Sequence, residues 1–212
     1  MIVLAIDTAL ELCSAAVLDG TAVRAARAEP MARGHQERLA PLVAELMAEA
    51  RVSFGALDRI GVTVGPGSFT GLRVGLAFAK GLGLALGRPV AGVGTLQALA
   101  AGTTGVAAAV IDARRGQVYL QAFRDGAPLG PPEALGLTDA QARLSPLAPD
   151  VLTGPGAALL AEAFPQARLD VRPGADPEAL ARLAAAAPAP QGPPAPVYLR
   201  APDAKLPGGI EP

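Results

Sequence analysis

The same order of short segments occurs twice along the 212-residue chain, and this recurrence limits the possible folds more than any other feature. Ala5-Ile-Asp7 ends an apolar run, and a second short run then leads to Asp19-Gly20, a favoured hairpin pair. Val110-Ile-Asp112 is likewise followed by a short run that leads to Asp125-Gly126. Asp7 and Asp112 lie 105 positions apart, close to half of the chain. The sequence therefore predicts two related lobes.

A Gly-Pro-Gly sequence also recurs, at Gly65-Pro66-Gly67 and again at Gly154-Pro155-Gly156. Proline is unevenly distributed, because 17 of the 21 prolines lie from Pro128 onward. We therefore expect a regular first domain over residues 1–104 and a reduced, loop-rich second domain over residues 105–212. The run from Pro188 to Pro196 is expected to be an extended surface connector within the second domain.

The first hundred residues alternate between strand and helix patterns. Short apolar runs predict strands, and apolar residues at i, i+3, i+4 and i+7 predict helices. The predicted strands are 2–8, 13–18, 21–28, 59–64 and 89–93, and the predicted helices are 36–50, 70–86 and 96–101. A meander of three strands followed by crossover units is typical of an α/β fold with a mixed sheet and helices packed on its faces.

Composition excludes several classes of function. The single cysteine, Cys13, excludes an internal disulfide and a cysteine-rich zinc site, and the single histidine, His35, excludes a histidine-pair metal site. The chain has 18 basic and 19 acidic residues, which gives no electrostatic basis for binding a polyanion alone. The most apolar stretch, Val74 to Gly87, is interrupted by glycines and Lys80 and is short for a membrane span. We expect a soluble protein that is not exported.

Asp7 and Asp112 are the first candidate site residues, because each is expected at the carboxyl end of a strand. Ligands of open α/β sheets gather at such ends, where a carboxylate can hold a metal or a phosphate-bound water. The alternative is that Asp7 only caps its turn by accepting hydrogen bonds from the amides of Thr8 and Ala9. The residues alone do not separate these two interpretations.

The stretch from Gly65 to Gly75 is the most distinctive motif. Ser68 or Thr70 can cap the helix that begins there, and the exposed amides at its start can hold an anion. No Gly-Lys-Ser/Thr follows, so the motif is not a Walker A loop. Ser68 is a weak candidate for a nucleophile, since His35 is the only possible histidine base. A stripe of small residues allows close approach of either the protein's own sheet or a partner helix, at Gly71, Gly75, Ala79 and Gly83.

Four segments together resemble the bacterial TsaB (YeaZ) family: Ala5–Thr8, His35–Pro41, Gly65–Gly75 and Tyr198–Pro202. The resemblance runs along nearly the whole chain. Its motif residues are His35, Glu37, Gly65, Pro66, Gly67, Ser68 and Arg73. It implies a two-lobed ASKHA fold (actin/Hsp70-like, RNase H-like) with mixed sheets flanked by helices. It also implies a vestigial nucleotide site in which Asp7 and Thr8 match the first phosphate loop, Asp112 the second, and Gly154 and Gly156 the adenosine side.

TsaB proteins are similar to TsaD, which places threonylcarbamoyl on N6 of adenosine 37 in tRNAs that read ANN codons. TsaD carries a His-x-x-x-His metal pair, whereas the matching segment here, Thr95–Ala101, contains no histidine. The resemblance therefore implies a non-catalytic cytoplasmic scaffold, with ATP and metal on its partner and no membrane contact. Its partners would be a TsaD-type catalytic subunit and a TsaE-type ATPase, with tRNA bound only through the complex and a homodimer when alone. The implied interface residues are Leu39, Leu42, Leu46, Gly71, Gly75 and Ala79.

A different class of function remains an alternative: a small ASKHA nucleotide-binding ATPase or kinase. Such an enzyme would use Asp7 and Asp112 around a magnesium–phosphate group. The run from Asp7 to Glu11 lacks the glycine-rich turn expected after the first aspartate, which argues against tight binding of ATP.

Overall fold

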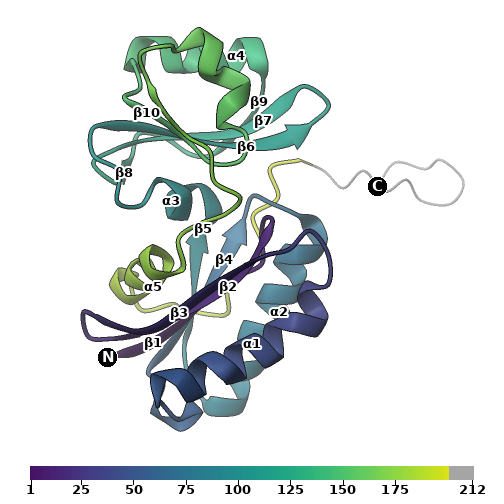
Figure 1. Cartoon of the computed structure of the whole chain (residues 1–212), viewed down its shortest axis with the longest axis vertical. Helices are drawn as coiled ribbons and strands as arrows, with labels where there is room; N and C mark the ends of the chain where they lie inside the picture. Colours follow the sequence, from purple (N-terminus) through teal and green to yellow (C-terminus); the bar gives the residue numbers. More distant parts are fainter. Residues whose placement is uncertain (201–212) are drawn as a thin grey trace, which may run out of the picture.

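The computed structural model describes residues 1–200 and consists of two α/β lobes, one above the other in Figure 1. Each lobe contains one mixed sheet. The strand order is β3-β2-β1-β4-β5 in the first sheet and β11-β10-β6-β7-β8 in the second. The predicted fold class, two mixed sheets flanked by helices, is confirmed.

The first sheet begins as a meander and is extended by crossover strands. β1 (Ile2–Asp7), β2 (Leu12–Asp19) and β3 (Ala22–Pro30) are antiparallel neighbours. β4 (Arg59–Gly65) pairs in parallel with β1, and β5 (Val90–Gly94) pairs in parallel with β4. All five predicted strands are therefore present. They place the carboxyl ends of β1, β4 and β5 at one edge of the sheet.

Two long helices cover one face of this sheet: α1 (His35–Ala50) and α2 (Phe69–Leu86), which lie side by side in Figure 1. A 3-10 turn, η1 (Phe54–Ala56), connects α1 to β4. The helical periodicity places an apolar stripe of α1 against the sheet, and Pro41 lies on its exposed side. Both helices occupy nearly the ranges that the sequence predicts.

The second sheet repeats the plan of the first. β6 (Val106–Arg114) and β7 (Gln117–Arg124) form an antiparallel hairpin. β10 (Val151–Thr153) is parallel to β6, and β11 (Arg168–Asp170) is parallel to β10. Two short strands pair with β7, namely β8 (Ala127–Pro128) and β9 (Glu133–Gly136). The recurrence read from the sequence is thus a recurrence of topology.

The covering elements of the second lobe are much shorter than those of the first. α4 (Leu137–Leu144) has 8 residues and the 3-10 helix η3 (Ala157–Ala163) has 7, against 16 in α1 and 18 in α2. A further 3-10 turn, η2 (Ser145–Leu147), follows α4. The second lobe is therefore a reduced version of the first, as its proline content predicts.

The last helix of each lobe packs on the sheet of the other lobe. α3 (Thr95–Ala100) follows the first sheet but packs Leu96 and Leu99 into the core of the second. α5 (Pro177–Ala186) follows the second sheet but packs Leu180 and Ala184 into the core of the first. α3 also places Ala98 in the core of the first sheet, so it lies between the two sheets. The division into domains 1–104 and 105–212 stays a prediction. Element order alone does not show which sheet a helix covers.

In the described part of the chain one helix, α2, is long and apolar enough to cross a membrane by length and composition alone. Its mean hydropathy is 1.3, and 33% of it is buried within the protein. One side of α2 packs on the first sheet through Leu72, Leu76 and Ala79. Some of the apolar residues of α2 therefore belong to the core of the first lobe, and the others lie at the surface.

Candidate partner surface and interlobe cleft

Asp7 is completely buried at the carboxyl end of β1. Its Oδ1 accepts hydrogen bonds from the amide of Ala9, at 2.8 Å, and from the Thr63 hydroxyl, at 2.6 Å. Its Oδ2 has no hydrogen-bond partner. Burial raises the pKa of this carboxyl, while the hydrogen bonds from Thr63 and Ala9 and the nearby His35 lower it by less. The hydrogen bond from the amide of Ala9 forms the turn cap, which is one of the two interpretations of Asp7 that the sequence allows.

Thr8 is buried beside Asp7, and neither residue lines the cleft between the lobes. The Thr8 hydroxyl donates to the carbonyl of Gly71 on α2, at 2.8 Å. The vestigial nucleotide site expected at these two residues stays a prediction, and in this structure neither side chain faces the cleft. Both side chains fasten the first turn of α2 to the end of β1 instead.

Asp112 occupies the equivalent position in the second lobe but a different environment. Its Oδ1 accepts from the amide of Arg114 at 2.7 Å, which repeats the turn that Asp7 makes with Ala9. Its side chain is 37% exposed and faces the cleft. Gly154 follows β10 with a φ of 105°, as Gly65 follows β4 with a φ of 110°. Gly156 is buried, and a Cβ there would lie 2.7 Å from the amide nitrogen of Asp112.

The cleft between the lobes has a volume of about 830 Å³. Three arginines line it, namely Arg33, Arg114 and Arg200, and so do three acids, namely Glu11, Glu37 and Asp112. This lining has no surplus of positive charge toward a polyphosphate. Within residues 1–200, no cluster of three or more histidine, cysteine or acidic side chains could hold a metal ion.

The motif residues His35 and Ser68 lie at the starts of the two long helices. Ser68 caps α2, because its hydroxyl accepts a hydrogen bond from the amide of Gly71 at 3.3 Å. His35 is the first residue of α1, and its Nε2 is buried without a hydrogen-bond partner. Gly67 packs so closely on the carbonyl of Ala9 that a Cβ would overlap it. These residues therefore join the helix starts to the turn after β1.

The structure corrects the predicted interface residues. All six are buried within the protein's own fold, namely Leu39, Leu42, Leu46, Gly71, Gly75 and Ala79. A Cβ on Gly75 would lie 2.6 Å from the Thr8 hydroxyl, and a Cβ on Gly71 would overlap the Thr8 carbonyl. The small residues on this side of α2 allow close approach to the protein's own first sheet, so they cannot also contact a partner.

A second set of small and apolar residues lies on the opposite, exposed side of α2. We call it the α2 outer face, and it consists of Thr70, Ala77, Gly81 and Leu84. Leu84 is 87% exposed, and nothing lies within 4 Å of the position of a Cβ on Gly81. On the neighbouring helix α1, Ala44 and Ala48 are also exposed. These four residues recur in the sequence at the helical spacing i, i+7, i+11 and i+14, which predicts that they share one side of the helix. The small residues of the buried side also recur at helical spacing, so the sequence alone does not tell the two sides apart.

Arg73 and two aromatic rings form a cluster at the first turns of α2. The Arg73 guanidinium carbon lies 3.7 Å from the centroid of the Phe69 ring. The centroid of the Tyr198 ring lies 5.4 Å from that of Phe69, and Arg73 Nε donates to the Tyr198 hydroxyl at 3.4 Å. The motif residue Arg73 thus holds the C-terminal segment against α2.

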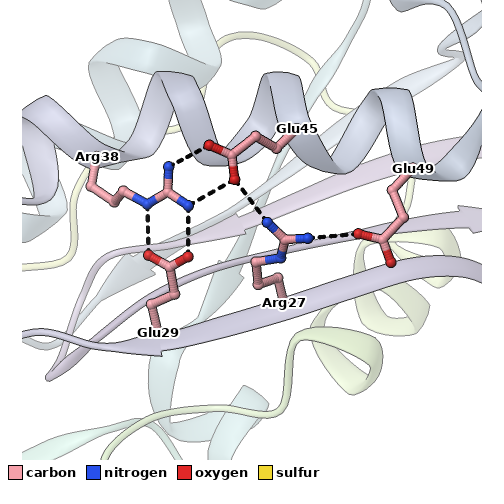
Figure 2. A network of polar contacts seen from close by, with 5 residues as sticks. All are labelled: Arg27, Glu29, Arg38, Glu45 and Glu49. Carbon is pink, nitrogen blue, oxygen red and sulfur yellow. Dashed lines mark hydrogen bonds and ion pairs between the residues drawn. The ribbon is translucent and has the colours of Figure 1, made fainter.

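An ion-pair network joins α1 to the edge strand β3 (Figure 2). Arg38 binds Glu29 and Glu45 at 2.7 Å each, and Arg27 binds Glu45 at 2.8 Å and Glu49 at 2.7 Å. Hydrogen bonds from Arg38 lower the pKa of Glu29 and of Glu45. Because these side chains are accessible to solvent, salt screens their attraction, and the network orients α1 more than it stabilises the fold.

Comparison with known proteins supports one family. A family model described as TsaD, tRNA N6-adenosine threonylcarbamoyltransferase, matches residues 28–129. An uncharacterized protein of Mycobacterium tuberculosis is 38% identical over 213 residues, which covers 96% of this chain and 93% of that protein. The Escherichia coli tRNA threonylcarbamoyladenosine biosynthesis protein TsaB is 41% identical over 125 residues, which covers 56% of this chain.

The matched region covers 53% of the E. coli protein and 40% of a Mycobacterium leprae relative, so the chain spans about half the length of these curated relatives. Solved structures match over more of their length. A Pseudomonas aeruginosa protein described as similar to the peptidase YeaZ superposes with a TM-score of 0.82 and 33% identity, covering 94% of this chain and 99% of that one. YeaZ from the same organism superposes with a TM-score of 0.73 and 33% identity, covering 87% and 90%. With its two-lobed topology and these matches together, the chain belongs to the TsaB (YeaZ) family.

Proposed function

We propose that the protein takes part in the biosynthesis of threonylcarbamoyladenosine in tRNA, as a non-catalytic subunit that binds and activates a TsaD-type enzyme. The observation that carries this proposal is the α2 outer face, Thr70, Ala77, Gly81 and Leu84, which is exposed, has small residues at its centre and ends in an exposed leucine. The names of the E. coli and Bacillus subtilis relatives supply the pathway.

The α2 outer face has the properties of a helix-packing surface. Small residues at Ala77 and Gly81 let a partner helix approach to the short interaxial distances of well-packed helices. The exposed side chain of Leu84 gains free energy when a partner covers it, by about 1.5–3 kcal/mol for full burial. Because Ala44 and Ala48 of α1 are also exposed, the surface extends across both long helices.

Two features support a role without chemistry of its own. Asp7 is sealed beneath the start of α2, so it is not presented to a nucleotide in the cleft. The segment 95–101, which matches the metal-binding segment of the TsaD enzymes, forms α3 and packs Leu96 and Leu99 into a core. On this proposal ATP and the metal bind to the partner, and tRNA is bound through the complex.

The remaining parts of the proposal concern the assembly. A TsaD-type catalytic subunit and a TsaE-type ATPase are its partners in the cytoplasm, and without them two copies pair through the same α2 outer face. α2 is long and apolar enough to cross a membrane by length and composition. In this arrangement its exposed side is covered by another protein chain and not by lipid.

The test compares Gly81→Leu with Gly130→Leu. Both glycines have open space around the position of a Cβ, and Gly130 lies in the second lobe far from α2 in sequence. We expect Gly81→Leu to keep or slightly raise its melting temperature, because leucine favours a helix more than glycine does. We expect the variant to lose both homodimerisation, measured by light scattering, and activation of threonylcarbamoyl transfer by a TsaD-type subunit. The Gly130→Leu variant keeps both properties.

Three results would overturn the proposal. One is full activation by the Gly81→Leu variant, which would move the partner surface elsewhere. Another is transfer of threonylcarbamoyl to tRNA by the purified chain alone, which would make it an enzyme. The last is micromolar binding of magnesium-ATP by the isolated chain in titration calorimetry, which would favour a nucleotide-binding ATPase or kinase.

A further inference from the structure

The segment Val197–Arg200, which we call the C-terminal clasp, contacts three parts of the protein that are far apart in sequence. Its first residue joins the first sheet, since the Val197 amide donates to the carbonyl of Val64 at 2.7 Å. A Cβ on Gly65 would lie 2.7 Å from the carbonyl oxygen of Val197, and Gly65 has a φ of 110°. The glycine at this position therefore gives the clasp room to lie against the end of β4.

The second residue of the clasp contacts α2. The Tyr198 ring packs on Phe69, and its hydroxyl accepts a hydrogen bond from Arg73. These two residues lie in the first two turns of the helix, beside the motif that Ser68 caps. The clasp thus holds the start of α2 from the side of the cleft.

The last residue of the clasp reaches the second lobe. Arg200 Nη1 donates to the carbonyl of Ala113 at 3.1 Å and to Oε1 of Gln117 at 3.4 Å. Ala113 and Gln117 lie on either side of the β6–β7 turn, next to Asp112. Four consecutive residues therefore bridge the two sheets, and all four line the interlobe cleft.

The route to the clasp is restricted by proline. Pro194 packs on Gly92 of β5. A Cβ added to Gly92 would lie 3.0 Å from the Cβ of Pro194. The run of prolines limits the backbone conformations open to the connector, which lowers the entropy lost when the clasp engages. In Figure 1 the clasp, in yellow, crosses between the lobes on the right, while α3 and α5 join them on the left.

We propose that Val197–Arg200 fixes the relative orientation of the two lobes, acting on the cleft side while α3 and α5 act as the hinge side. Without the clasp, the lobes are connected by α3 and α5 and by the turn after β1, where Leu10 packs on the second-lobe core, so the cleft opens and closes over a wider range. The clasp also accounts for the Tyr-Leu-Arg motif at 198–200, which the proposed partner surface does not use. This inference does not depend on the proposed function, because it concerns the isolated chain.

The test measures the distance between the lobes by pulsed electron paramagnetic resonance. Spin labels are placed at Thr21→Cys in the first lobe and Ala142→Cys in the second, in a Cys13→Ala background diluted with unlabelled protein. Both label sites are exposed. We expect one narrow distance distribution in the parent and a broader or shifted one in Arg200→Ala. The control is Arg182→Ala, which removes an exposed arginine of α5 that pairs only locally with Glu178.

A second measurement separates loss of the clasp from loss of the fold. In Arg200→Ala and Tyr198→Ala the Val197 amide should exchange with solvent roughly fivefold faster, the factor expected when about 1 kcal/mol of hydrogen bonding is lost. Core amides of both sheets should keep their protection. An unchanged distance distribution in Arg200→Ala and in a chain that ends after Pro196 would overturn the proposal. Loss of core protection in both point variants would also overturn it, because the segment would then be part of the core.

Discussion

The two aspartates at the ends of β1 and β6 show how environment separates equivalent residues. Both accept a hydrogen bond from the amide two residues further on. Asp7 is buried under the start of α2 and has an unpartnered Oδ2, whereas Asp112 faces the cleft. The cost of burying a charge without full pairing therefore falls on Asp7 alone.

Relative to the parent, the Asp7→Asn variant should become more stable as pH rises above about 4, the ordinary pKa of an aspartate in the unfolded chain, until the pH has passed the pKa of the folded protein. The folded state holds the proton of Asp7 more tightly than the unfolded state, because burial raises the pKa. Stability from this group is therefore lost as pH rises through the folded pKa, and asparagine does not titrate. Thermal melts at several pH values measure the difference, which should reach about 2–4 °C if 1 kcal/mol is gained.

Asp112→Asn is the matched control for this prediction. Its carboxyl makes the same turn but remains in contact with solvent, so Asp112→Asn relieves no buried charge and should not raise the melting temperature as Asp7→Asn does. A difference between Asp7→Asn and the parent that does not change with pH would show that Asp7 does not titrate differently in the folded and unfolded states.

The sequence identifies Asp7 as a residue of interest but not what it does. A strand that ends in aspartate predicts either a ligand site or a turn cap, and the structure shows the cap, through the amide of Ala9. What decides between the two is the packing of Gly67 and Gly71 on the turn, which leaves no opening toward the cleft. Such packing depends on contacts between segments about 60 residues apart, which local patterns do not reveal.

At the scale of elements, α2 has two faces of similar composition and opposite environments. Gly71 and Gly75 touch the turn after β1, while Ala77 and Gly81 are exposed. Both sets are made of small residues at helical spacing. Single substitutions can therefore distinguish the face that packs on the sheet from the face that is available to a partner.

Alanine should have opposite effects at two glycines of this helix. Gly81→Ala should stabilise the fold by up to about 1 kcal/mol, because alanine favours the helix and nothing lies nearby. Gly71→Ala should destabilise it by about 1–3 kcal/mol, because the new Cβ overlaps the Thr8 carbonyl. Chemical denaturation of the two variants measures both changes, and equal effects would contradict the assigned faces.

Periodicity predicts the extent of α1 and α2 well, but it does not predict which side of α2 meets the sheet. Apolar residues such as Leu76 and Leu84 occur on both sides, so the hydrophobic pattern has no single direction. In α1 the alternative side carries Glu45 and Glu49, and there the pattern identifies the buried face correctly. The predicted interface was wrong because burial in the protein's own core and burial in a partner favour the same residue types.

For the whole molecule, the main organising feature is the exchange of α3 and α5 between the lobes. Each sheet is covered on one face by its own helices and on the other by a helix contributed from the other half of the chain. The two lobes therefore share structural elements although their sheets are separate. The repeated segments in the sequence predict the two sheets, and only the three-dimensional arrangement shows the exchange.

A fragment that ends at residue 104 should not fold. It contains all five strands of the first sheet but lacks α5, which leaves the core residues Val3, Ala5 and Leu18 exposed on the uncovered face. A chain that ends after Ala187 keeps α5 and should show a cooperative thermal transition. Dispersed amide resonances from the 1–104 fragment would contradict this expectation and would make the first lobe an independent domain.

Because α5 covers the first sheet but comes late in the chain, it also sets the order in which the two lobes can finish folding during synthesis. The strands of the first sheet emerge by Gly94, but the helix that covers their second face ends at Ala186, about 90 residues later. At about 5–20 residues per second, the uncovered apolar face waits on the order of 5 to 20 s during synthesis. The half of the protein that is translated first is thus completed last, and its second apolar face is uncovered during that interval.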